Sequence, residues 1–314
     1  MIGNWLMLVL WTAYSPPPEL SQLAAAWGGY MAWCERLQGS VTRNQGLVGS
    51  PPSKTFRYDL KQSPFGVVFG MWVNQRETVR VHSQSYGFEL QRDFGQEWKV
   101  THVGSSKEDA EELRLLSRTY TAYGLALWGA SNFLPTMIQE PDFRLTKCEP
   151  LMWNGRRAAA LTFTRGSAKP HAGRIAAGRI LALPDKHWLL VEFDVIQEYI
   201  DPSNRPTRNP MMGRVDYVDL DVPYPIIRRH WIRSEEVGIA EGPQTITLDF
   251  DFKPGSPENS EFTLTAFGLP EPFGVTWDRP TPWWLYALNS AGVLFVVAVI
   301  VSFWKRRLAA RQAA

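Results

Sequence analysis

Five aspartates stand at spacings that would suit chemistry with paired carboxylates. They fall in two stretches, Asp216, Asp219 and Asp221, then Asp249 and Asp251. Residues two apart in a strand share a face, and neighbouring carboxylates can bind Ca²⁺ or act as an acid and base pair. The same spacing is typical of the solvent face of a half-buried strand, since Leu248 and Phe250 alternate with the second pair. We expect solvent-facing carboxylates, so an exported hydrolase is the third and least favoured function.

The five histidines form no metal-ligand pattern. None is paired with another histidine or a carboxylate at ligand spacing within one predicted element, and the sequence has no HExxH, GxSxG, Walker A, GxGxxG or CxxC motif. We therefore expect no catalytic residue, no metal and no cofactor. His82 and His102 are expected on partly exposed strands. The remaining histidines are His171, His187 and His230.

The two cysteines, Cys34 and Cys148, leave two outcomes open. In an oxidising compartment they can form a disulfide that closes a long loop. Alternatively both are buried thiols, because cysteine is commonly buried without reacting. Two cysteines are too few for a four-cysteine zinc site or for a small fold held together by disulfides.

The apolar residues offer non-covalent binding instead. The chain contains 14 Trp and 16 Phe, and large aromatic side chains either line a binding cavity or fill a core. The candidates for such a cavity lie on the first predicted helix and on predicted strands. They are Trp27, Tyr30, Met31, Phe69, Met71, Trp72 and Trp188.

Two amphipathic helices are expected to position these residues. The first covers Glu19–Leu37, where apolar residues recur at i, i+3, i+4 and i+7, and the prolines at 16–18 suit a helix start. The second begins at the capping-box sequence Ser105–Glu108 and runs to about residue 128. Asn132–Pro141 is predicted as a loop or short helical turn, and Asp201–Pro210 as an exposed polar loop.

Short segments rich in β-branched and aromatic residues predict strands on both sides of the second helix. Short connections within each set indicate antiparallel hairpins. The run Gly66–Asn74 lacks alternation and predicts a strand covered on both faces. The predicted strands are Phe56–Leu60, Gly66–Asn74, Thr78–Ser83, Tyr86–Arg92, Trp98–Val103, Phe143–Cys148, Ala158–Thr164, Arg174–Leu183, Trp188–Tyr199, Gly213–Val222, Ile226–Ser234, Gln244–Phe252 and Phe262–Phe267.

The order of these elements predicts an α+β fold, with helices packed on a large curved antiparallel sheet. It resembles the LolA/LolB/RseB-like fold of bacterial envelope proteins, in which an incomplete β-barrel curls around helices. Gly213–Tyr217 followed by Pro223, Pro225 and Arg228 is similar to the late strands of that family. The resemblance covers about residues 19–268. It implies a concave apolar cavity suited to an acyl chain or a peptide.

The C-terminal sequence predicts one transmembrane helix. Residues 283–304 carry no charge, and at about 1.5 Å per residue a helix of this length spans a bilayer core. Tryptophans stand at both ends, where aromatic rings prefer the membrane interface. The stop-transfer cluster that follows is Lys305, Arg306 and Arg307. It predicts that the tail, residues 305–314, is cytoplasmic and the bulk of the chain is not.

The other end and the junction complete the predicted domain order. Residues 1–15 contain a short apolar run and are predicted as a signal peptide, with an uncleaved anchor or a misplaced start as alternatives. Residues 16–268 would form the exoplasmic domain and 269–282 a Pro-rich juxtamembrane linker. Pro270–Pro272, the apolar segment and the basic tail are together loosely similar to a PEP-CTERM sorting tail, and we favour a retained anchor.

The charge distribution fits this topology and excludes one class of partner. The chain has 33 Lys+Arg and 31 Asp+Glu, for a net charge of +2, but four of the cations lie in the last ten residues. The rest is mildly acidic, which is not typical of a nucleic-acid binder. The favoured function is a single-pass bacterial envelope protein, not an enzyme, whose periplasmic domain binds a lipid, lipopeptide or other hydrophobic ligand. The alternative is a protein-interaction or envelope-sensing module of the RseB kind.

Overall fold

The structure is a computed structural model of the 314-residue chain. It describes residues 20–84, 86–104, 107–128, 132–166, 173–200, 206–235 and 242–272. The chain divides into two units, Met1–Pro270 and Glu271–Ala314, and the fold below is that of the first. The predicted signal peptide, transmembrane helix and basic tail lie outside the described residues. Within the described ranges, no helix is long and apolar enough to cross a membrane.

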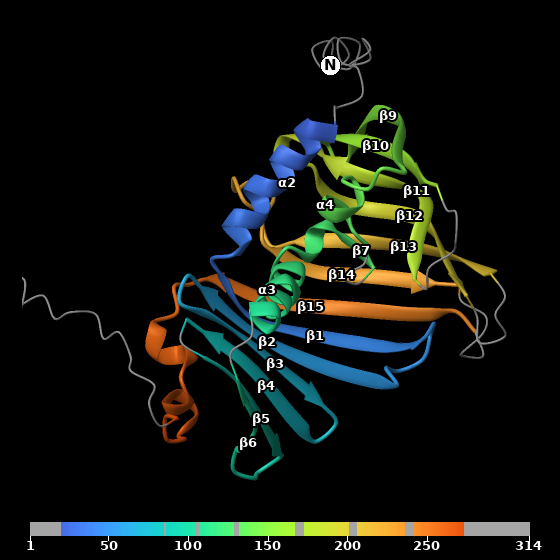
Figure 1. The fold of residues 1–314 in the computed structure, drawn as a ribbon. Helices are drawn as coiled ribbons and strands as arrows, with labels where there is room; N and C mark the ends of the chain where they lie inside the picture. The colour runs from blue at the N-terminus through green and yellow to red at the C-terminus, as the bar shows by residue number, and fades with distance from the viewer. Residues whose placement is uncertain are drawn as a thin grey trace, which may run out of the picture. The chain divides into compact units, whose positions relative to one another are not determined.

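Strands dominate this unit (Figure 1). The helices are α2 (Leu20–Cys34), α3 (Lys107–Thr121) and α4 (Leu134–Met137), with 3₁₀ turns η1 (Tyr123–Leu125), η2 (Pro184–Lys186), η3 (Asn259–Phe262) and η4 (Leu264–Phe267). The strands are β1 (Leu37–Leu47), β2 (Lys54–Ser63), β3 (Gly66–Val73), β4 (Arg76–Ser83), β5 (Gly87–Asp93), β6 (Lys99–Gly104), β7 (Ala126–Trp128), β8 (Asn132–Phe133), β9 (Phe143–Trp153), β10 (Arg156–Arg165), β11 (Arg174–Leu183), β12 (Leu189–Ile200), β13 (Pro206–Tyr217), β14 (Ile227–Ser234) and β15 (Gln244–Pro254).

Thirteen of these strands form one antiparallel sheet that does not close on itself. Its order is β6-β5-β4-β3-β2-β1-β15-β14-β13-β12-β11-β10-β9, so the only non-sequential neighbours are β1 and β15. β7 and β8 form a separate two-stranded pair. The predicted architecture of two antiparallel meanders joined into one large open sheet is confirmed.

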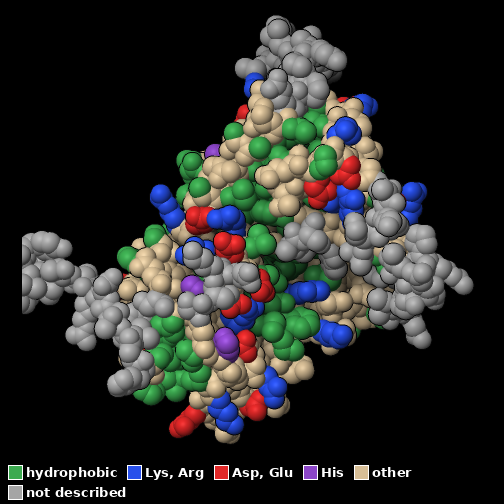
Figure 2. All heavy atoms as spheres, in the orientation of Figure 1, with side chains coloured by type: hydrophobic (Ala, Val, Ile, Leu, Met, Phe, Trp, Pro, Cys, Tyr) green, Lys and Arg blue, Asp and Glu red, His purple; other side chains and the backbone are tan. Residues whose placement is uncertain are grey.

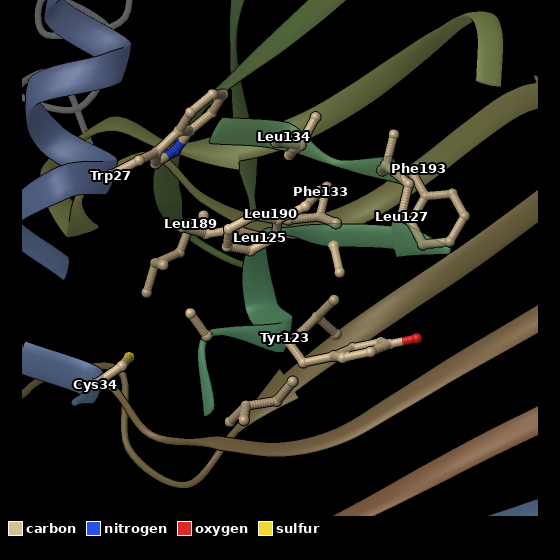
Figure 3. Packing of buried hydrophobic residues seen from close by; sticks show 14 of the residues in the cluster. Trp27, Cys34, Tyr123, Leu125, Leu127, Phe133, Leu134, Leu189, Leu190 and Phe193 are labelled. Atoms are coloured by element: carbon tan, nitrogen blue, oxygen red, sulfur yellow. The ribbon is translucent and has the colours of Figure 1, made fainter. Parts of the chain in front are cut away.

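The helices lie over one face of the sheet, which we call the inner face (Figure 1). The apolar stripe of α2 is buried there, through Leu23, Trp27, Tyr30 and Cys34. Figure 3 shows how side chains from α2, η1, β7, β8 and β12 converge into one cluster of buried hydrophobic residues. This cluster also takes in residues of β1–β3 and β9–β15, and it is the main core of the fold.

The buried face changes at β3. In β2 the inner-face residues Tyr58 and Leu60 are buried, whereas in β4 the buried residues Val79 and Val81 point to the opposite, outer face. β3 lies between them, and its first five residues are all buried, which confirms the predicted strand covered on both faces. Among the described residues, the main core has no member from β4, β5 or β6.

The segment Ser256–Leu269, which we call the strap, covers the outer face of β3–β5. Phe262 of the strap is wholly buried and Leu264 nearly so. The backbone N–H of Leu264 donates to the Tyr86 hydroxyl at 3.2 Å. Phe267 packs edge-on against Phe88, with ring centroids 5.8 Å apart. The strap therefore buries the apolar outer face at this end of the sheet, as the helices bury the inner face of the other strands.

One predicted strand in this region is wrong. Phe262–Phe267 forms the two 3₁₀ turns of the strap rather than a strand. A capping box between Glu258 and Glu261 begins the first turn, and the side chain of Thr263 accepts from the backbone of Ala266 in the second. These local side-chain hydrogen bonds compete with strand pairing.

Other element boundaries also differ from the prediction. β1 was not predicted, because its sequence is polar and contains Gly39 and Gly46. Pairing along both edges, with β2 and β15, overrides its weak strand propensity. β13 begins at Pro206, inside the predicted polar loop, and ends at Tyr217 rather than Val222. The second helix ends at Thr121, seven residues earlier than predicted.

Candidate binding site

Six of the seven predicted cavity residues belong to the main core or pack against it. Trp27 and Tyr30 are wholly buried. Their polar atoms make hydrogen bonds that hold α2 in place. The Trp27 indole donates to the Trp188 carbonyl at 3.0 Å, and the Tyr30 hydroxyl to the Pro225 carbonyl at 2.8 Å. Phe69 is buried in the same core, and the others, Met31, Met71 and Trp188, are partly buried against it.

The seventh candidate, Trp72, lies on the outer face. Its indole donates to the Asp59 carboxylate at 3.0 Å, and the Arg92 guanidinium lies 5.6 Å from its ring centroid. The seven residues are therefore split between two faces. In this structure the six inner ones fill a core, and their role in ligand binding stays a prediction.

A groove of about 800 Å³ opens where α2 ends, and it is lined mainly by polar residues. One side is formed by the end of α2, one by α3, and the floor by the β2–β3 turn and the residues after β15. In Figure 2, basic and acidic side chains gather beside the end of α2. The lining residues are Ala32, Glu35, Arg36, Gln62, Ser63, Pro64, Gly66, Arg114, Arg118, Gly255 and Ser256.

Three arginines give this groove a positive excess. Arg118 makes an ion pair with Glu35, with 2.5 Å between nitrogen and oxygen, and both side chains are nearly half exposed. Arg36 and Arg114 are exposed, and neither makes an ion pair with any other described residue. Most other exposed arginines of the sheet are paired, as Arg57 is with Asp59 and Arg229 with Asp249. We call these residues the arginine groove.

The backbone around the arginine groove is fixed by several contacts. The last turn of α2 is closed by the N–H of Arg36, which donates to the Trp33 carbonyl at 3.0 Å. The Arg36 carbonyl then accepts from Gly255 at 2.8 Å. A Cβ at Gly255 would stand 2.1 Å from the end of the Gln38 side chain, so a larger residue here would require that side chain to move. On α3, Arg114 and Arg118 are four residues apart and so share a face.

A second pocket, of about 350 Å³, lies on the inner face of β4–β6 beneath α3. His82 of β4 and His102 of β6 both line it, with Glu89 and Asp109 nearby. Two glycines make room for the rings: a Cβ at Gly87 would stand 3.2 Å from His82, and one at Gly104 only 2.6 Å from His102. Among the described residues, no group of three potential ligands stands at metal-binding spacing.

The aspartates do not converge on a catalytic pair. Asp219 and Asp221 lie after the end of β13, so the prediction that they share its strand with Asp216 is wrong. Asp221 pairs with Arg156, and this hydrogen bond holds the pKa of its carboxyl below the usual range. Asp249 alternates with buried residues of β15 as predicted and pairs with Arg229 at 2.6 Å.

The two cysteines are free thiols in this structure. Cys34 is buried, and burial raises the pKa of its thiol far above the usual value. Cys148 is half-buried, and burial followed by the neighbouring Glu149 raises its pKa as well. Because the thiolate is the nucleophilic form, neither cysteine is activated for chemistry.

His230 is the buried polar group that sequence reasoning missed. It is wholly buried on β14, between the rings of Tyr123 and Phe193, and neither ring nitrogen has a hydrogen-bond partner among the described residues. Burial lowers its pKa to about 3, so it is neutral at physiological pH. The alternation of His230 with Arg229 and Trp231 placed it on the apolar face and could have revealed it.

The arginine groove was also missed, since its residues come from four separate stretches of the chain. The spacing of Arg114 and Arg118 on a predicted helix was the one local signal. The pocket that His82 and His102 line could have been predicted from the sequence. In a meander with the predicted order, these two histidines fall on strands that are separated by only one other strand.

No family model matches the sequence, and no curated protein matches it. Among solved structures, a DUF1329 family protein from Desulfovibrio piger is 11% identical, with 77% of this chain and 98% of that chain covered, at a TM-score of 0.38. The complex of Pseudomonas aeruginosa MucA and MucB is 13% identical, with coverage of 74% and 99% and a TM-score of 0.18. MucB with MucA(peri) is 12% identical, with the same coverage and a TM-score of 0.17. At these TM-scores and identities, the likenesses place the chain in no family.

Proposed function

We propose that this protein is a non-enzymatic binding domain of the bacterial envelope, and that its arginine groove receives an acidic segment of a partner protein. The observation that carries the proposal is the pair of exposed guanidinium groups, Arg36 and Arg114, without acidic partners among the described residues. They flank the same groove as Arg118.

The chemistry of the groove favours carboxylates. A guanidinium presents two parallel N–H donors that match a carboxylate, and such charge-assisted hydrogen bonds are stronger than neutral ones. Arg118 already makes one charge-assisted hydrogen bond of this kind, from its Nη2 to Glu35 Oε1. The groove volume of about 800 Å³ is large enough for several residues of an extended peptide.

The aspartates and cysteines that the sequence offered for chemistry lie in environments that do not activate them. The aspartates are paired with arginines or exposed. The pKa of each cysteine thiol is raised, so the nucleophilic thiolate is disfavoured. The envelope location rests on the sequence, through the uncharged run 283–304 and the cluster at 305–307. A partner in the same compartment would meet the groove directly.

A lipid or lipopeptide is the second candidate ligand, and the observation that favours it is the apolar inner face itself. Trp27, Tyr30 and Phe69 belong to one buried apolar cluster between α2 and the sheet. An acyl chain would have to displace some of these side chains, because protein interiors are packed without large voids. The arginine groove needs no such rearrangement, which is why we rank the acidic segment first.

The test is a binding titration with the full-length protein in detergent micelles. A fluorescein-labelled octaglutamate peptide serves as the probe, and fluorescence anisotropy reports binding. We expect saturable binding that weakens as salt is raised. Reversing two charges in Arg36→Glu/Arg114→Glu should weaken binding at least about tenfold, since exposed charged contacts contribute about 1 kcal/mol each.

The matched control reverses two arginines elsewhere. Arg179 on β11 and Arg228 on β14 are also exposed and make no ion pair with a described residue. Arg179→Glu/Arg228→Glu changes the net charge equally, so equal losses in both double variants would show attraction to overall charge and count against the groove. Loss of probe binding when a phospholipid is added to the micelles, equal in the wild type and in Arg36→Glu/Arg114→Glu, would favour the lipid.

A further inference from the structure

β6 is an edge strand that lacks the usual protection against pairing. It ends the thirteen-stranded sheet, and five of its six residues are exposed. The unpaired N–H and C=O groups of an edge attract further strands unless charges, prolines or a covering segment block them. β6 contains no proline, and its single charged residue is Lys99 at the very start.

The opposite edge, β9, is protected. Pro150 stands in the middle of β9 and has no N–H to donate. Lys147 and Glu149 add charges on the same strand and pair with each other at 2.7 Å. Within the described residues, the β9 edge is thus blocked by a proline and charges, whereas the β6 edge has no proline and one terminal charge.

Two rows of apolar side chains run across the outer face to β6 and stop there. One row passes from Val68 through Val81 and Phe88 to Val103. The other passes from Val79 through Leu90 to Val100. The inner members of both rows are buried, but Val103 is 46% exposed and Val100 is 45% exposed. These two valines are the points where the rows lack a partner.

A β-bulge explains why both valines are on the same face. His102 of β6 lies opposite Glu89 of β5, but the next β5 residue, Leu90, lies opposite Val100. Thr101 is therefore the extra residue of β6. Without this extra residue, residues three apart would lie on opposite faces. The bulge therefore brings Val100 and Val103 together on the outer face, beside the strap.

From this geometry we propose that two copies of the protein dimerise by antiparallel pairing of their β6 strands. With the two-fold axis between Thr101 and His102, Val100 lies opposite the partner's Val103, and Val103 opposite the partner's Val100. Lys99 then lies opposite the partner's Gly104, so no like charges meet. The strand is complementary to itself in both shape and charge, as a two-fold interface requires.

A second copy would continue both the backbone pairing and the apolar rows beyond β6. The four valines of the two copies extend both apolar rows across the interface, and the backbone groups of each β6 gain a partner strand. A single six-residue strand buries little area compared with standard interfaces, so the dimer should be weak and depend on protein concentration. The pairing involves neither Arg36 nor Arg114 and is independent of the proposed function.

The experiment measures the molar mass of the full-length protein in detergent micelles by sedimentation velocity over a wide range of concentration. We expect a monomer–dimer equilibrium. Val100→Lys/Val103→Lys places like charges against each other and should shift the midpoint of dimerisation at least tenfold upward. The control is Thr146→Lys/Met152→Lys on β9, where both residues are exposed and the equilibrium should not change.

Cysteine cross-linking keeps the proposal testable if the lysine variant does not fold. In Val100→Cys/Val103→Cys, each new thiol lies opposite one of the partner's, so mild oxidation should give a disulfide-linked dimer. Thr146→Cys/Met152→Cys and the wild-type chain, with its native Cys34 and Cys148, should not cross-link. A monomer at every concentration, or a dimer indifferent to changes at residues 100 and 103, overturns the proposal.

Discussion

The β4–β6 end of the sheet and the rest of the sheet bury opposite faces. Across β1–β3 and β9–β15 the inner face is apolar and helices cover it. Across β4–β6 the outer face is apolar and the strap covers its β4 and β5 part, while the inner face carries Arg80, His82 and Glu89. One continuous sheet thus has its main core on one face and a second core, at the β4–β6 end, on the other, with β3 between them. A further small cluster lies at β10–β12 and consists of Ala158, Ala160, Leu181, Leu183 and Val191. The difference shows that a strand's pattern fixes which face is buried, but not what covers that face.

The largest expected effect separates the two cores. Phe262 is wholly buried in the strap and lies against β3. Phe262→Ala should cost about 3–4 kcal/mol of stability, as large-to-small changes in a core do. The loss should appear in denaturant unfolding and, by hydrogen exchange, first in β4–β6. The control Leu115→Ala removes a side chain that is 52% exposed and should change nothing measurable. Uniform loss of protection across all strands would mean that the two cores are one.

The next effect belongs to the main core and depends on pH. The folded-state pKa of His230 is about 3, below the ordinary value of 6.5 in the unfolded chain. The unfolded state therefore binds a proton that the folded state excludes, and stability falls as pH drops below 6.5. The slope approaches about 1.4 kcal/mol per pH unit between 6.5 and 3.

The variant His230→Leu should flatten this part of the pH profile. It also removes two buried nitrogens without hydrogen-bond partners among the described residues, so its stability at neutral pH should equal or exceed that of the wild type. Urea unfolding between pH 4.5 and 7.5 gives the comparison. An unchanged slope in the variant would show that His230 is protonated or hydrated in the folded state.

A smaller effect compares a buried ion pair with an exposed one. The Arg165 side chain is 3% exposed and pairs with Glu140, which is 31% exposed, at 2.5 Å. Glu140→Gln leaves this guanidinium without its full partner and should cost about 2 kcal/mol, less than for a fully buried pair because Glu140 is partly solvated. Thermal unfolding measures the loss.

The matched exposed pair lies at the β4–β6 end. Arg76 and Asp93 are each more than 60% exposed, at 3.2 Å. Asp93→Asn should change stability by less than about 0.5 kcal/mol. If Asp93→Asn costs as much as Glu140→Gln, burial does not decide the strength of ion pairs in this sheet.

Most of the fold was predictable because strand signals are local. The alternation in β4 and the unbroken apolar run of β3 indicated their burial correctly. β1 was not predicted because its polar sequence becomes a strand only through pairing on both edges. The strap was predicted as a strand because 3₁₀ turns can carry the same apolar residues as a strand. The arginine groove depends on the spatial meeting of Arg36, Arg114 and Gly255, which no local pattern encodes.

The most direct test of the arginine groove is chemical footprinting of arginines with phenylglyoxal, read by mass spectrometry, with and without octaglutamate. Arg36 and Arg114 are exposed and should be modified readily in the free protein. The peptide should protect these two, whereas Arg179 and Arg228 should be modified equally in both samples. Protection of all four alike, or of neither Arg36 nor Arg114 under conditions where the peptide binds, would contradict the proposed site.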